Sequence, residues 1–138
     1  MSSLLWSVRG WHGMTILLLA EGDSRVREVL RALLLAVWDA LDRLTIIECA
    51  PEEAVSLVRV FRPSRVLLEA TMFGALALPE LVRECQNVGA RLVIMSSEPL
   101  GASAESFVEC GAVRFLRKPF DGAELLLALK AADEAAAD

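Results

Sequence analysis

Side chains that can bind ions or move protons stand at the ends of four apolar stretches of the sequence. The stretches span 16–20, 66–68, 92–95 and 112–116, and the side chains that follow them are Glu21, Glu69, Ser96 and Lys118. Two carboxylates suit a divalent cation or general acid–base work. A hydroxyl and an ammonium suit an anion such as a phosphoryl group. The combination indicates a phosphate-handling site, provided that the fold brings these positions together.

Apolar runs alternate with amphipathic segments along the chain. Residues 16–20 are continuously apolar, as expected of a strand buried on both faces. After Asp23 or Ser24, apolar residues recur at three- and four-residue steps, which is typical of a helix. They are Val26, Val29, Leu30, Leu33, Leu34, Val37 and Leu41. Further strands are predicted at 45–49, 65–70, 91–97 and 112–116, and further helices at 51–60, 79–87, 102–110 and after Asp121.

This alternation predicts an α/β fold in which five parallel strands form one sheet with helices on both faces. The expected class is a flavodoxin-like (βα)5 three-layer sandwich. In such folds, ligand chemistry gathers at the carboxyl ends of the strands. Glu21, Glu69, Ser96 and Lys118 are all predicted to lie at that edge.

Composition narrows the classes of protein. The 138 residues suit one domain, 55 % of them are hydrophobic, and the formal net charge of −5 argues against binding nucleic acid. No segment reaches the ~18–20 apolar residues of a membrane span. The three cysteines, Cys49, Cys85 and Cys110, fit neither a disulfide framework nor a zinc motif, so buried reduced thiols in a cytoplasmic protein are expected. The single histidine, His12, lies outside the expected core.

The domain is expected to span 14–133, followed by a short tail at 134–138. Residues 1–13 contain only a short apolar piece and do not resemble a signal peptide. They are either a leader ahead of Met14 or a docking arm that uses Trp6 and Trp11.

Two stretches carry a resemblance to a known family. The sequence at 62–69 is Arg-Pro-Ser-Arg-Val-Leu-Leu-Glu, and that at 111–120 is Gly-Ala-Val-Arg-Phe-Leu-Arg-Lys-Pro-Phe. The first resembles the strand that leads to the phosphoacceptor in the receiver domain of bacterial response regulators. The second resembles the fifth strand of that domain and its Lys-Pro turn. The resemblance covers nearly all of residues 14–133.

The resemblance implies a role for each position, and two of the residues depart from the pattern. The family takes phosphate on an aspartate beside magnesium, but Glu69 stands at the acceptor position. Gly22 replaces one of the paired acids after the first strand, and glycine has no side-chain oxygen. The positions that match the family's site are Glu21, Gly22, Glu69, Thr71, Ser96 and Lys118, with Phe115 as the aromatic switch residue and Pro119 after an expected cis peptide bond.

These departures predict weak or absent magnesium binding and no other cofactor or metal. Asp23 either swings in as a substitute ligand or caps the next helix, which is favoured. The longer Glu69 is expected to approach Lys118 as an ion pair. With Ser96 donating to the same carboxylate, that pair would imitate part of the phosphorylated state. The alternative is a solvated glutamate without signalling meaning.

The function expected is a phosphorylation-independent receiver-like (pseudo-receiver) module from a bacterial cytoplasm, which is not an enzyme. The alternatives are a weakly phosphorylated two-component receiver and a small carboxylate-dependent enzyme that uses Glu21 and Glu69. A protein partner or second copy is expected to bind through the helix at 102–110, the strand at 112–116 and the last helix. The residues expected there are Leu100, Val108, Leu126 and Leu127, unless the last helix buries a wider apolar stripe.

Overall fold

A computed structural model describes residues 14–38, 43–69, 78–99, 102–109 and 112–137. Trp6, Trp11, His12, Thr71, Leu100 and Cys110 lie outside the described residues. The strands are β1 (Met14–Ala20), β2 (Arg43–Cys49), β3 (Arg65–Glu69), β4 (Arg91–Ser96) and β5 (Val113–Arg117). The helices are α2 (Ser24–Val37), the 3-10 turn η3 (Pro51–Glu53), α3 (Ala54–Phe61), α4 (Leu78–Val88), α5 (Ala102–Glu109) and α6 (Gly122–Ala137).

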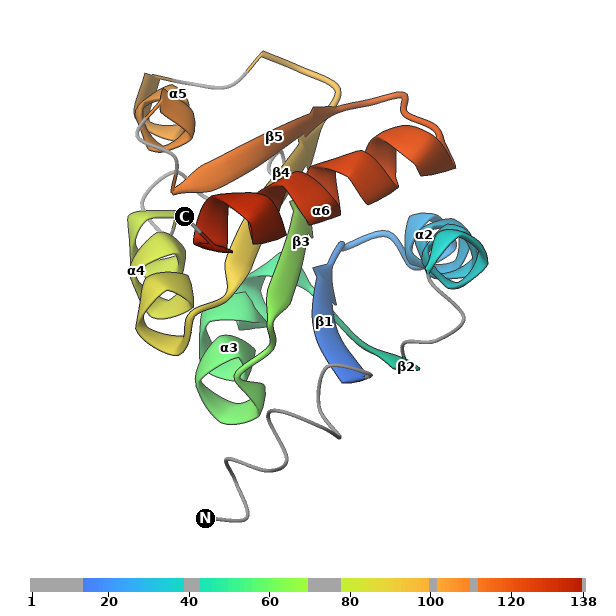
Figure 1. The fold of residues 1–138 in the computed structure, drawn as a ribbon, viewed down its shortest axis with the longest axis horizontal. Coiled ribbons are helices and arrows are strands. Elements are labelled where there is room, and N and C mark those ends of the chain that lie inside the picture. Colours follow the sequence, from blue (N-terminus) through green and yellow to red (C-terminus); the bar gives the residue numbers. More distant parts are fainter. Residues whose placement is uncertain (1–13, 39–42, 70–77, 100–101, 110–111, 138) are drawn as a thin grey trace.

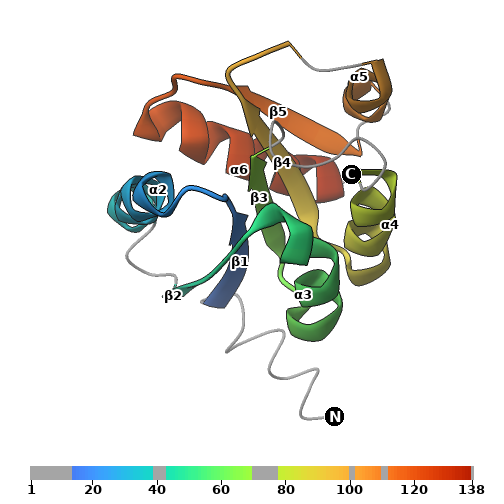
Figure 2. The same cartoon turned by 180° about the vertical axis from the view of Figure 1, so that it is seen from behind.

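The described strands form one parallel sheet in the order β2-β1-β3-β4-β5. Helices α2 and α6 cover one face, and α3, α4 and α5 cover the other (Figures 1 and 2). The predicted flavodoxin-like three-layer sandwich is therefore confirmed. No helix in the described part of the chain is long and apolar enough to cross a membrane.

Alternating strand residues divide the core into two layers, as the pleat of a sheet requires. In β1, Leu17 and Leu19 pack with Leu34 of α2 and Leu129 of α6. Leu18 of the same strand faces the opposite layer, which contains Val58 of α3, Leu81 of α4 and Cys85. The central strands are apolar on both faces because both are covered by helices.

The observed element boundaries differ slightly from the predicted ones. Strand β1 begins two residues early, at Met14, because its register pairs Met14 with Arg43 of β2. Helix α2 ends at Val37 rather than at Leu41, because Trp38 adopts an extended conformation (φ −72°, ψ 145°). Helix α3 ends where Arg62 takes a left-handed conformation with φ 48°.

The first turn of α6 packs unusually close to α2. Asp121 Oδ1 accepts a hydrogen bond from Glu124 N at 2.8 Å, and Glu124 Oε1 accepts one from Asp121 N at 3.2 Å. This reciprocal pair fixes the start of the helix. A Cβ atom on Gly122 would stand 2.6 Å from Val37 Cγ1 and 3.2 Å from Leu33 Cδ1. The contact therefore requires a residue without a side chain at position 122.

Candidate functional site

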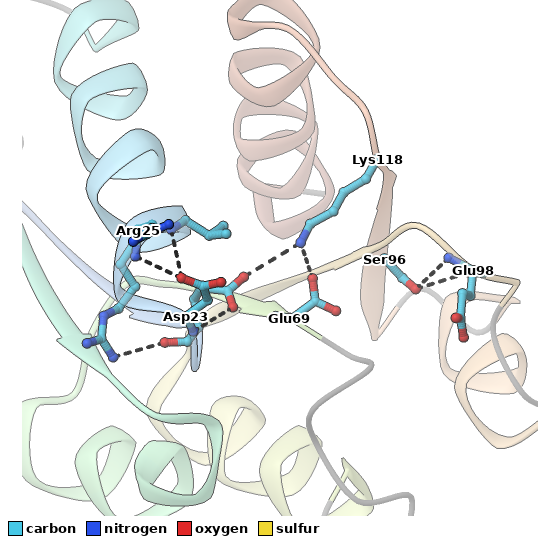
Figure 3. Close-up of polar contacts among 9 residues, drawn as sticks. Asp23, Arg25, Glu69, Ser96, Glu98 and Lys118 are labelled. Carbon is cyan, nitrogen blue, oxygen red and sulfur yellow. Dashed lines mark hydrogen bonds and ion pairs between the residues drawn. The ribbon is translucent and has the colours of Figure 1, made fainter.

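Three of the predicted site residues meet at the carboxyl edge of the sheet. Glu21 follows β1, Glu69 ends β3, and Lys118 follows β5. The Lys118 backbone N–H donates to Ser96 O at 2.9 Å, which places the lysine at the end of the intervening strand β4. From there the ammonium contacts Glu69 Oε2 and lies 3.6 Å from Glu21 Oε1 (Figure 3). The ion pair expected between Glu69 and Lys118 is present.

The two carboxylates are buried, although the lysine is partly open to solvent. Glu21 is 2 % exposed and Glu69 is 3 % exposed, whereas the Lys118 side chain is 26 % exposed. Charges in such surroundings need a partner, because an unpaired buried charge is costly. With both carboxylates ionised, one ammonium faces two negative charges. Lys118 thus supplies the cationic charge of this cluster from within the chain.

Glu21 is held by the backbone that leads into α2. Its Oε2 accepts a hydrogen bond from Asp23 N at 3.1 Å, and its carbonyl oxygen accepts one from Arg27 Nη1 at 3.0 Å. Within the described residues its Oε1 has no hydrogen-bond partner and faces only the Lys118 ammonium. The side chain is therefore fixed in direction, with one oxygen aimed at the lysine.

Asp23 is the N-cap of α2. Its Oδ1 accepts hydrogen bonds from Arg25 N at 2.9 Å and Val26 N at 3.4 Å (Figure 3). Of the two roles considered for Asp23, helix capping is the one observed. Gly22, between Asp23 and Glu21, is exposed and contributes no side-chain oxygen.

Ser96 has a different partner from the one predicted. Its Oγ donates to Glu98 O at 3.0 Å and accepts from Glu98 N at 3.1 Å. Figure 3 shows this hydroxyl turned toward Glu98, whereas Lys118 points to Glu69. The expected donation from Ser96 to Glu69 is wrong for this structure, because two backbone groups of the following turn occupy the hydroxyl. Sequence reasoning missed Glu98, whose contribution comes from its backbone.

The remaining predicted positions flank the cluster. The Lys118-Pro119 peptide bond is cis, as the resemblance implied. Phe115 is half-buried and packs against the core layer of α3 and α4. Thr71, the expected backbone ligand, lies outside the described residues.

The donor set does not match a magnesium site. Magnesium prefers near-octahedral oxygen ligands. Here the facing groups are two glutamates and an ammonium, while Asp23 is committed to the helix cap and Gly22 offers no side-chain oxygen. Within the ranges that the structure describes, no group of three or more His, Cys, Asp or Glu side chains is placed to hold a metal ion.

The expected partner surface is only partly apolar and exposed. Leu127 of α6 is 69 % exposed, and Leu126 beside it is half-buried. Leu126 lies about 40° around the helix from Gly122, which faces α2, and this position explains its partial burial. Val108 of α5 is half-buried against the core, and Leu100 lies outside the described residues. The interface itself stays a prediction.

Other large apolar side chains are exposed elsewhere. Val29, placed in the apolar repeat of the first helix, is 66 % exposed because Leu30 and Leu34 define the buried face of α2. Leu35, Val60 and Phe61 are exposed as well, and the sequence analysis missed all three.

Two buried thiols lie outside the charged cluster. Burial raises the pKa of Cys49 to about 11, with a further contribution from the Glu53 carboxylate. Burial likewise raises the pKa of Cys85 to about 12, with help from Glu84. Both cysteines are unpaired. Each is thus an uncharged core thiol near neutral pH and a poor nucleophile.

The fold and this site define the class of protein to which the chain is similar. No protein-family model matches the chain, and no curated protein matches it. Among solved structures, the signal receiver domain of a modulated diguanylate cyclase from Desulfovibrio desulfuricans aligns with a TM-score of 0.69 at 19 % identity, covering 90 % of this chain and 97 % of that one.

Two regulators of the LuxR family are also similar. A DNA-binding response regulator from Staphylococcus aureus aligns with a TM-score of 0.68 at 19 % identity, covering 86 % of this chain and 98 % of that one. A two-component response regulator from Aurantimonas gives 0.66 at 26 % identity, covering 86 % and 84 %. The structural neighbours of this chain are thus response regulator receiver domains, and the match to them covers the sheet and its helices.

Proposed function

We propose that this chain is a receiver-like protein-interaction module of the bacterial cytoplasm that works without phosphorylation and is not an enzyme. The observation that carries the proposal is the Lys118 ammonium, which faces both buried carboxylates. A receiver uses a metal ion and a phosphoryl group to balance charge at this edge. Here the chain supplies its own cation, which supports a site that needs neither.

Three further features support this assignment. Gly22 removes a carboxylate that a magnesium ion would need, so we expect magnesium binding to be weak or absent. Glu69 carries its carboxylate one methylene further than an aspartate would, and small misplacements can cost ~10²-fold in rate. Its Oε2 already contacts the lysine.

We further propose that the Glu69–Lys118 pair imitates part of the phosphorylated state. Support comes from the contact itself and from the burial of Glu69. The Ser96 hydroxyl, bonded to the Glu98 backbone, does not take part in this imitation. The signal would pass through the Glu69–Lys118 pair alone. Contact with a protein partner or a second copy would use α5, β5 and α6, with exposed Leu127 in its centre.

Intact-mass measurement tests the proposal. The full chain, incubated with acetyl phosphate and magnesium, should show no stable phosphoryl addition. The matched variant Gly22→Asp with Glu69→Asp should bind magnesium more tightly in a titration. Glu69→Asp alone should change little, because position 22 still lacks a ligand. A phosphoryl group found on Glu69 of the unmodified chain would overturn the proposal.

The weakly phosphorylated receiver is the second candidate. One observation favours it: Glu21 Oε1 is buried with no hydrogen-bond partner among the described residues, and it faces the interior of the site. Magnesium titration of the unmodified chain separates the two candidates. Binding in the micromolar range would favour the second, and no saturation at millimolar concentration would favour the first.

A further inference from the structure

The end of α3 carries two exposed apolar side chains whose role the proposed function does not explain. Val60 is 69 % exposed and Phe61 is 45 % exposed, whereas Ala54 and Val58 of the same helix are fully buried. We call Val60 and Phe61 the α3-end patch. Arg62, exposed beside it, ends the helix in a left-handed conformation. An aromatic ring and a guanidinium side by side suit an indole, through ring packing and cation–π contact.

The α3-end patch lies close to the point where the chain enters the sheet. Ser64, three residues after Phe61, donates its backbone N–H to Ile16 O of β1 at 2.9 Å. Ile16 is only two residues from Met14, the first residue of β1. Both views show the end of α3 and the start of β1 at the same edge of the sheet (Figures 1 and 2).

The thirteen residues that precede Met14 contain suitable side chains at a suitable distance along the chain. Trp11 is three residues before Met14, and three residues span at most about 11 Å. Trp6 and the apolar pair Leu4-Leu5 lie further along the same segment. An indole tethered so near the patch has a high effective concentration there, which a separate partner lacks.

We propose that residues 1–13 fold back over the α3-end patch, with the Trp11 indole packed against Phe61. The contact is intramolecular and lies at the amino edge of the sheet, opposite the Glu21–Glu69–Lys118 cluster. It does not depend on the proposed function. The segment thereby covers apolar surface at the edge where α3 ends.

A double-mutant cycle on the full chain tests this contact. The unfolding equilibrium is measured by urea titration and far-UV circular dichroism for the unmodified chain, Trp11→Ala, Phe61→Ala and the double variant. Aromatic pairs are coupled by about 2- to 12-fold in the equilibrium constant. The double variant should therefore be less destabilised than the product of the two single effects, by that factor. Phe61 is exposed enough for all four proteins to fold.

A matched cycle provides the control. Leu127 is also an exposed apolar residue, but it lies on α6, so Trp11→Ala and Leu127→Ala should act independently. Independent effects of Trp11→Ala and Phe61→Ala would overturn the proposal. So would a coupling that grows with protein concentration, because the occupant of the patch would then be a second copy.

Discussion

Lys118 is the residue on which the charged cluster depends. The pair was expected to be largely exposed and worth little to stability, but the structure buries both carboxylates beneath the lysine. Lys118→Ala leaves two buried carboxylates without a cation. Removing one partner of a fully buried pair costs ~3–5 kcal/mol, and the partial exposure of Lys118 reduces the expected cost to about 2–3 kcal/mol. Urea unfolding at neutral pH measures it.

Two comparisons identify the cause of that loss. Glu69→Gln in the Lys118→Ala background should restore part of the stability, because it removes one unpaired charge. Arg59→Ala breaks exposed ion pairs with Glu80 and Glu84 and should have only a small effect. If Lys118→Ala behaves like Arg59→Ala, the buried cluster does not depend on the lysine.

The buried thiols give the stability a pH dependence with a definite sign. The pKa of Cys49 rises from 9.0 to about 11 and that of Cys85 from 9.0 to about 12, so the folded state retains protons that the unfolded state releases. The stabilisation is complete below pH 9 and is lost as the pH rises toward 11 and 12. Cys49→Ala and Cys85→Ala should each flatten the fall in unfolding free energy between pH 8 and 11. An unchanged slope in both variants would contradict the assignment.

At the scale of elements, the packing of α6 on α2 makes an unusual prediction about Gly122. Glycine to alanine favours helix formation by up to ~1 kcal/mol in a helix interior. Here the new Cβ would stand 2.6 Å from Val37 Cγ1, and valine in a helix has one strongly preferred rotamer. Overpacking costs ~1–3 kcal/mol, so Gly122→Ala should destabilise the domain by about 1 kcal/mol.

The neighbouring valine provides the test of this explanation. In a Val37→Ala background the methyl group finds room, and Gly122→Ala should become neutral or stabilising in urea titrations. Equal destabilisation in both backgrounds would show that the close approach of α2 and α6 is not the cause.

The elements were more predictable than their contacts. Strand and helix positions follow from periodicity, because burial on both faces of the sheet leaves apolar runs such as 16–20. The capping role of Asp23 follows from its residue type and place. The partner of Ser96 did not follow, because it is the backbone of Glu98. The exposure of Val29 and the partial burial of Leu126 depend on where neighbouring helices lie, and a single helix pattern does not contain that information.

At the scale of the whole molecule, the two core layers share the same five strands. Leu81 of α4 lies in one layer and Leu34 of α2 in the other, and both are fully buried. Leu81→Ala and Leu34→Ala should each cost ~2–5 kcal/mol. Because every strand contributes to both layers, each variant should unfold in a single transition with one midpoint by circular dichroism and by tryptophan fluorescence. Separate midpoints for the two probes would mean that the layers unfold independently.

The ammonium of Lys118 also has a consequence for timing. A covalent phosphoryl group is added by one event and removed by another, so it gives a receiver a lifetime and a resting state. A lysine encoded in the chain is in place as soon as the domain folds, and no reaction takes it away. Under the proposed function, such a module has no clock of its own. Its output would follow its abundance in the cell, and synthesis and proteolysis would set the signal.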